Sequence, residues 1–305
     1  MLQLFQHASQ LIFSLIIIFC LVFDTFLLII AIKNRKSQSI PFVYIIFMAI
    51  TGWFGKVANL LMINAFVLSN WLGADYEKYR EYFGKQVTLL STFAYLTPLC
   101  LNWLMTVHRV SIFLFPFRSL RIFSDLKTAG YCGGITLIVL ISLLIPYYSW
   151  CSLNFYSPTN TFISACGSGR HPIIKFQNDF TIYLPFASMF INFGIISYLK
   201  CSNTLKTFSK FHEVREKAMI RQSIGIAVYL SIYEFGYQLM RIFPGQYESL
   251  PIEIRTVIFQ FRLTIVCSIN FLVYFVETKS TRSLILTTLP HRKHKIAVTT
   301  TVTFT

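Results

Sequence analysis

Charged residues are scarce in this sequence, and acidic residues are scarcer still. Only 13% of the 305 residues are charged, and 12 Asp and Glu stand against 27 Lys and Arg, for a formal net charge of +15. Hydrophobic residues make up 55% of the chain, and the mean hydropathy is +0.59. A soluble domain of this length cannot bury so much apolar surface. The scarcity of charge therefore excludes an ordinary soluble protein and indicates one that is dissolved in lipid.

Several local signatures are also absent. There is no Asn-x-Ser/Thr sequon, so we expect no N-linked glycans. The cysteines and histidines lack metal-ligand spacing and no Gly-x-Ser-x-Gly motif occurs, so we expect no metal, no other cofactor and no enzymatic activity. The basic residues occupy the gaps between apolar runs instead of forming a patch on a soluble fold, so we expect no nucleic-acid partner.

The sequence contains seven long apolar runs. A helix of about 20 residues crosses a hydrocarbon core about 30 Å thick. The first run has no basic segment before it and no small-residue cleavage site, and it ends in Lys33, Arg35 and Lys36, so we expect it to remain as a span. The predicted fold is an all-α membrane protein, a seven-transmembrane helix bundle over residues 1–277, followed by a basic, Thr-rich tail at 278–305. The predicted spans are residues 11–32, 41–68, 84–107, 129–150, 180–201, 219–242 and 254–276.

Lys and Arg are unevenly divided between the two sides of this bundle. Eighteen of them fall in the first, third and fifth connections and the tail, against seven on the opposite side. Because cytoplasmic loops carry the excess of positive charge, we expect the N-terminus outside and the C-terminus in the cytoplasm of a multi-pass protein in a cell membrane. Cys151 and Cys166 lie in one outward connection, where the oxidising environment permits a disulfide between them.

Polar residues inside the spans fall into two layers when depth is counted at about 1.5 Å per residue. The lower layer, about 10 to 12 Å above the cytoplasmic boundary, contains Asp24, Asn102 and Asn270. These side chains can bind one another, water or a cation, or they can serve as static links between helices. A charge at this depth costs at least about 2.5 kcal/mol, so Asp24 requires a partner.

The upper layer, about 22 to 24 Å above the same boundary, contains Lys56, Glu234 and Arg262. If the three faces converge, Glu234 pairs with one cation and leaves the other to receive an acidic ligand. A buried ion-pair network without any ligand is an alternative, and so is a cation that extends towards water. We assign these three residues to a candidate ligand pocket.

Two local motifs resemble those of G-protein-coupled receptors. The end of the third span reads Met105-Thr106-Val107-His108-Arg109-Val110 and is followed by Phe115-Pro116, which is similar to the Asp-Arg-Tyr signature with His and Val substituted. In the seventh span, Asn270-Phe271-Leu272-Val273-Tyr274 resembles Asn-Pro-x-x-Tyr with Phe in place of Pro. Gly84 occupies the approximate position where many receptors carry a cysteine that links span three to the second outward loop.

Together with the short N-terminus, these motifs most resemble the nematode serpentine chemoreceptors of the Srx and Srxa type. The resemblance implies a receptor in the plasma or ciliary membrane of a sensory cell, with a small-molecule ligand, membrane lipid and a heterotrimeric G protein as its partners. In such receptors the arginine, here Arg109, pairs with an acid at the base of span six, here Glu213 or Glu216. On activation span six swings outward, the arginine contacts the G protein and Tyr274 fills the vacated space.

A different class of function remains open from the sequence. In a transporter or channel, Asp24, Lys56, Glu234 and Arg262 would line a translocation path. Arg109 can likewise be explained by the positive-inside rule alone. Secondary transporters are often built from inverted repeats, and no internal repeat is visible in the sequence.

Overall fold

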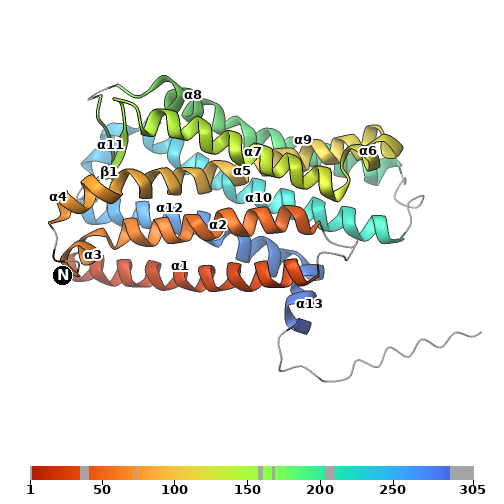
Figure 1. The fold of residues 1–305 in the computed structure, drawn as a ribbon, viewed down its shortest axis with the longest axis horizontal. Helices are drawn as coiled ribbons and strands as arrows, with labels where there is room; N and C mark the ends of the chain where they lie inside the picture. Colours follow the sequence, from red (N-terminus) through yellow and green to blue (C-terminus); the bar gives the residue numbers. More distant parts are fainter. Residues whose placement is uncertain are drawn as a thin grey trace, which may run out of the picture.

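A computed structural model describes residues 2–34, 41–71, 73, 75–156, 161–166, 169–202 and 210–288 of the chain. Within this part of the chain, six helices are long and apolar enough to cross a membrane. They form a helical membrane bundle (Figure 1). These helices are α1 (Leu2–Lys33), α2 (Phe42–Ile63), α5 (Lys85–Leu114), α7 (Asp125–Tyr147), α8 (Pro172–Thr181) with α9 (Tyr183–Ser202), and α12 (Ile252–Phe271) with the π-helix η3 (Leu272–Glu277).

The sixth predicted span corresponds to a seventh long helix, α10 (Lys210–Ile242), which packs against α9, α12 and α5. It is less apolar than the other six because polar side chains, including the buried Gln222 and Glu234, lie along it. Elsewhere in the bundle α2 packs between α1 and α5, and α12 packs against α1. The seven apolar runs of the sequence thus correspond to seven long helices.

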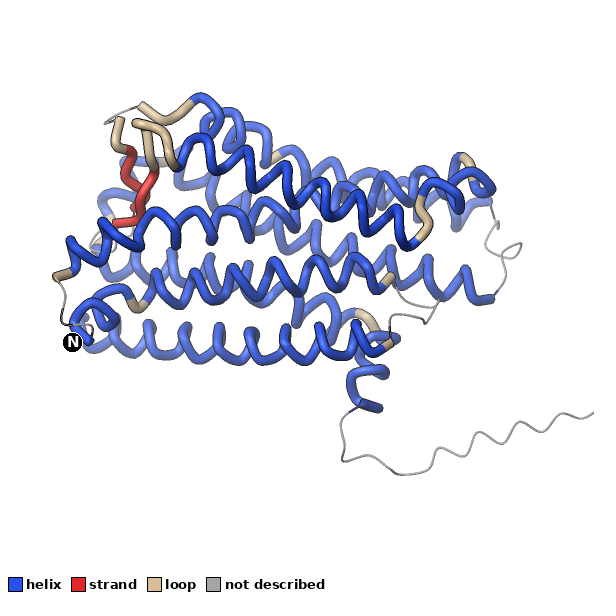
Figure 2. The backbone as a smooth tube through the Cα atoms, in the orientation of Figure 1, coloured by secondary structure: helices blue, strands red, loops and turns tan. Residues whose placement is uncertain are grey.

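Short elements join these helices. They are α3 (Ala65–Trp71), α4 (Tyr76–Tyr79), the π-helix η1 (Arg80–Gly84), α6 (Pro116–Ile122), α11 (Pro244–Ser249), α13 (Lys279–Thr288) and the strands β1 (Leu153–Tyr156) and β2 (Thr161–Ser164). The N-terminus, the strands and α11 lie at one end of the bundle, and α6 and α13 lie at the other (Figures 1 and 2). This arrangement agrees with the predicted alternation of connections, although which end faces outward stays a prediction.

The strands form an antiparallel hairpin that an all-α prediction did not include. Cys151 and Cys166 flank the hairpin and are joined in a disulfide, with their Cα atoms 4.9 Å apart. Phe155 is buried and stacks on Phe259 of α12, with ring centroids 5.1 Å apart. The hairpin therefore packs into that end of the bundle.

The hairpin is also attached to the start of α5. The Phe155 backbone N–H donates to Thr88 Oγ1 at 3.2 Å, and Asn154 Nδ2 donates to the Arg80 carbonyl at 3.2 Å. A Cβ on Gly84 would lie 2.3 Å from Asn154 Oδ1, so only glycine permits this approach. Close packing and hydrogen bonds therefore join the start of span three to this loop, at the position where many receptors have a cysteine that forms a disulfide.

The start of the basic, Thr-rich tail is helical. Residues Lys279–Thr288 form α13, and Ile285 and Thr281 are buried against the bundle. Thr278 donates from its backbone N–H and its hydroxyl to the Val273 carbonyl, at 3.1 and 2.8 Å, where the π-helix η3 ends. Residues 289–305 lie outside the described part of the chain.

Candidate functional site

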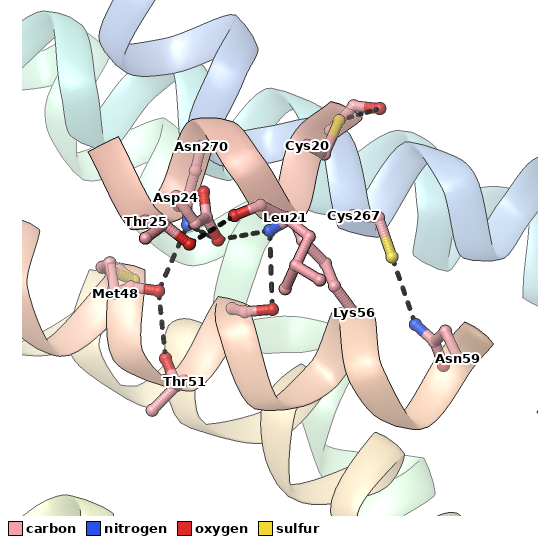
Figure 3. Close-up of polar contacts among 12 residues, drawn as sticks. Cys20, Leu21, Asp24, Thr25, Met48, Thr51, Lys56, Asn59, Cys267 and Asn270 are labelled. Atoms are coloured by element: carbon pink, nitrogen blue, oxygen red, sulfur yellow. Dashed lines mark hydrogen bonds and ion pairs between the residues drawn. The ribbon is translucent and has the colours of Figure 1, made fainter. Parts of the chain in front are cut away.

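Two oppositely charged side chains, Asp24 on α1 and Lys56 on α2, are buried together inside the bundle. Lys56 Nζ lies 2.5 Å from Asp24 Oδ2, and the relative exposure of the two residues is 2% and 1% (Figure 3). Removing two charges from water costs several kcal/mol per ion, and close pairing offsets that cost. The pair thus explains how both side chains are tolerated inside a membrane helix bundle.

This ion pair joins Lys56, which the sequence places in the upper layer, to Asp24, which it places in the lower layer. The two residues fall in different layers when depth is counted along the backbone, because that count ignores where the side chains reach. Helical side chains lean towards the N-terminus of their own helix. Since α1 and α2 run in opposite directions, the Asp24 and Lys56 side chains lean towards each other. The long lysine side chain spans the remaining distance.

Asn270 on α12 completes a three-helix contact. Its Nδ2 donates to Asp24 Oδ2 at 3.0 Å and to the Met48 carbonyl at 3.2 Å (Figure 3). Gly52 on α2 leaves the space for this group, because a Cβ there would lie 2.7 Å from Asn270 Nδ2 and 2.8 Å from Asp24 Oδ2. Of the predicted lower layer, Asp24 and Asn270 are therefore brought together, and Asn102 belongs to a separate cluster.

A small cavity of about 30 Å³ lies next to this charged contact. Residues of α2, α5, α10 and α12 line it, and the polar ones among these mostly apolar residues include Lys56, Asn59, Ser91 and Tyr95. Ser91 Oγ donates to Asn59 Oδ1 at 2.7 Å, and Asn59 Nδ2 lies 3.2 Å from Cys267 Sγ. The Tyr95 hydroxyl is buried and makes no hydrogen bond among the described residues. A cavity of this size with a few polar groups has room for water or for part of a small ligand.

The other two residues of the predicted upper layer do not share an ion pair. Glu234 on α10 is buried, with a relative exposure of 2%, and the ion pairs among the described residues join neither Lys56 nor Arg262 to it. The Arg262 guanidinium lies over the rings of Tyr233 and Tyr237, at 4.6 and 5.1 Å from their centroids. Asp24 therefore neutralises Lys56, and two tyrosines hold Arg262, in place of ion pairs to Glu234. A ligand pocket at Lys56, Glu234 and Arg262 stays a prediction.

Arg109, at the opposite end of the bundle, lies in a buried polar junction between α5, α9 and α10. Its Nη1 donates to Asn192 Oδ1 on α9, and the relative exposure of Arg109 is only 2%. Asn192 Nδ2 in turn donates to Thr106 Oγ1 at 3.2 Å and to Ser223 Oγ of α10 at 3.1 Å. The arginine is therefore held by a network that crosses three helices.

Ser188 joins the same junction one turn before Asn192. Its hydroxyl lies 2.7 Å from Thr106 Oγ1 and accepts from Asn102 Nδ2 at 3.0 Å. Asn102, which was expected beside Asp24, thus extends this junction along α5. Ser188, Asn192 and Ser223 were missed by sequence reasoning, which weighted ionisable groups; the i, i+4 spacing of Ser188 and Asn192 in an apolar span was the available signal.

His108 and Val110 flank Arg109 but face other neighbours. His108 Nδ1 lies 3.1 Å from the Tyr44 hydroxyl of α2, and its ring stacks on Phe123 with centroids 4.1 Å apart. Phe123 follows α6, so His108 connects α5 to the short helix after span three. Val110 is half-buried. Glu213 and Glu216 fall on the α10 backbone, but their side chains lie outside the described ones, so their pairing with Arg109 stays a prediction.

Tyr274 is fully buried in η3, and its hydroxyl has no hydrogen-bond partner among the described residues. The α-helix α12 ends at Phe271, the position where the receptor signature has proline, and a π-helical turn follows. Such turns locally widen a helix and are frequent at functional sites. The described residues contain no cluster of three or more potential metal ligands.

Comparison with known proteins agrees with the two altered motifs. The family model of Caenorhabditis serpentine receptor-like proteins, class xa, matches residues 39–193, about half of the chain. The chain is also 28% identical over 319 residues to Serpentine receptor class XA 10 of Caenorhabditis elegans, with 94% of each protein covered. The resemblance to nematode serpentine receptors is therefore confirmed, and this chain belongs to the serpentine receptor-like proteins of class xa.

Proposed function

We propose that this receptor is a G-protein-coupled chemoreceptor, which senses a small environmental molecule and activates a heterotrimeric G protein. Membership of a serpentine receptor family supports the general class. The observation that supports the proposal most strongly is the junction of Arg109, Asn192 and Ser223, because it places the signature arginine between the third, fifth and sixth spans. The proposed orientation has this junction at the cytoplasmic end.

The hydrogen bonds of this junction suggest how activation proceeds. Asn192 joins Arg109 on α5 to Ser223 on α10, so an outward movement of α10 breaks the contact to Ser223. An agonist that binds the open arrangement more tightly shifts the population towards it. Arg109 is then released to contact the G-protein α-subunit, and the buried Tyr274, whose helix η3 packs against α10, is placed to fill the space.

The proposed ligand pocket lies in the other half of the bundle, in the region of Lys56, Glu234 and Arg262. The small cavity beside Lys56 and Tyr95 supports this location. A ligand there contacts α2, α5 and α12 and can alter how α10 packs against them. Ligand binding and G-protein coupling therefore take place at opposite ends of the same helices.

The experiment is a screen of small odorants against the receptor in a heterologous cell, with G-protein activation as the readout. We expect at least one agonist, whose response is abolished by Arg109→Ala while surface expression is unchanged. Arg118→Ala, at an exposed arginine on α6, is the matched control and should leave the response intact. An agonist response that survives Arg109→Ala would contradict the proposed role of the arginine.

A further inference from the structure

Arg262 has no ionic partner in the part of the chain that the structure describes. Among the residues that the structure describes, the ion pairs are Asp24 with Lys56 and Glu77 with Arg80. Arg262 instead lies over the rings of Tyr233 and Tyr237, and its Nη1 donates a long hydrogen bond to Met240 Sδ at 4.0 Å. Its buried Nε makes no hydrogen bond among the described residues. A guanidinium has five donors in a planar fork that matches a carboxylate. The Nε and the donors that do not face Met240 are therefore available to an anion.

A second arginine lies on the same face of α12. Arg255 precedes Arg262 by seven residues, which is two helical turns and about 10 Å along the axis. Its Nε is also buried and makes no hydrogen bond to the residues that the structure describes. Tyr247 of α11 lies near both arginines: burial raises the pKa of its hydroxyl, and the charges of Arg262 and Arg255 oppose that rise. Two arginines thus follow one another from the end of the bundle inward.

The small cavity begins one turn further in. Val266, four residues after Arg262, lines it, and so does Leu230, three residues before Tyr233. Tyr95 lines the cavity as well, and its ring lies 4.9 Å from that of Tyr233. The unbonded Tyr95 hydroxyl is a polar group that a bound molecule can satisfy. Arg262 and the cavity are therefore parts of one region.

We infer that Arg262 binds the carboxylate of a short organic acid whose body enters the cavity beside Tyr95. The inference rests on the proposed receptor function and names the chemical class of its ligand. Lys56 does not compete for this role, because Asp24 already pairs with it. A monovalent carboxylate is favoured over a phosphate because Arg262 lies ten residues, about 15 Å, into α12, where each further charge is costly to desolvate. Arg255, nearer the helix start, attracts the anion on its way in.

The test measures thermal unfolding of the purified full-length receptor in nanodiscs with acetate, butyrate, hexanoate, octanoate and benzoate, each paired with its methyl ester. We expect at least one acid to raise the unfolding temperature and its ester to have no effect. Arg262→Gln should weaken the apparent Kd at least about tenfold, the loss expected for a charge-assisted hydrogen bond. Arg170→Gln, at an exposed arginine between the hairpin and α8, is the matched control and should bind like the wild type.

Three results would overturn the inference: no acid of the panel stabilises the receptor, an ester binds as well as its acid, or Arg262→Gln binds as tightly as the wild type. The comparison of acid with ester uses the wild type and stands even if a variant misfolds. Nucleotide exchange on a G protein is recorded in parallel. Acid binding without exchange would contradict the receptor function alone, and odorant-driven exchange without acid binding would contradict the carboxylate site alone.

Discussion

Lys56 on α2 and Asp24 on α1 form a buried ion pair with 2.5 Å between Nζ and Oδ2, and Asn270 of α12 donates to the same oxygen. This contact joins three helices in the interior of the bundle. A buried pair adds little net stability compared with an apolar replacement, but the loss of one partner leaves an uncompensated charge. The change in the free energy of unfolding therefore depends strongly on which residue of the pair is substituted.

Lys56→Met should destabilise the receptor strongly, because Asp24 keeps its charge without a counterion. The cost is about 3 to 5 kcal/mol, which corresponds to a fall in unfolding temperature on the order of 10 °C. Adding Asp24→Asn to Lys56→Met should recover most of that loss. Thermal unfolding of the purified variants checks both values. Equal stability of the Lys56→Met variant and the wild type would show that the pair does not form.

Gly52→Ala should also destabilise the receptor, because the new Cβ would lie 2.7 Å from Asn270 Nδ2 and 2.8 Å from Asp24 Oδ2. Overpacking of this kind costs about 1 to 3 kcal/mol. Gly134→Ala on α7 is the matched control, since a Cβ there meets nothing within 4 Å. It should be neutral or slightly stabilising. If the Gly52→Ala variant were as stable as the Gly134→Ala variant, Asp24 and Asn270 would not lie against Gly52.

The disulfide between Cys151 and Cys166 offers a test of orientation as well as of stability. The two cysteines are 15 residues apart, and a loop of this length contributes about 3 kcal/mol. Cys151→Ser should lower the unfolding temperature, and reduction of the wild type should have a similar effect. Cys100→Ser, at a free cysteine, is the control. Mass spectrometry that finds free thiols at both positions in cell-surface receptor would contradict an outward hairpin.

The number and positions of the helices were predictable because a lipid bilayer requires an apolar run of about 20 residues for each helix that crosses it. Each predicted run corresponds to a helix, and Arg109 and Tyr274 are both buried at the helix ends where the motifs placed them. The hairpin and α13 were not predicted. Both owe their structure to packing against the bundle, as the buried Phe155 and Ile285 show, and such contacts between distant residues leave little local pattern.

Side-chain partners were harder to predict than helices. Counting depth along the backbone separated Lys56 from Asp24, because it ignored the length and direction of their side chains. The same count placed Asn102 with Asp24, whereas Asn102 donates to Ser188 of α9. Such pairings depend on the direction in which each side chain points around its helix. In an apolar span both the lipid face and the core face are hydrophobic, so the sequence shows almost no periodicity from which that direction can be predicted.

The central claim is that the junction at Arg109 restrains the sixth span and that its release activates a G protein. The most direct test is agonist-independent nucleotide exchange on a G protein by receptor in nanodiscs. Asn192→Ala removes the link between Arg109 and Ser223, so it should raise basal exchange several-fold, and Arg109→Ala added to Asn192→Ala should abolish that rise. Basal exchange that is unchanged by Asn192→Ala, or raised equally with and without Arg109, would contradict the account.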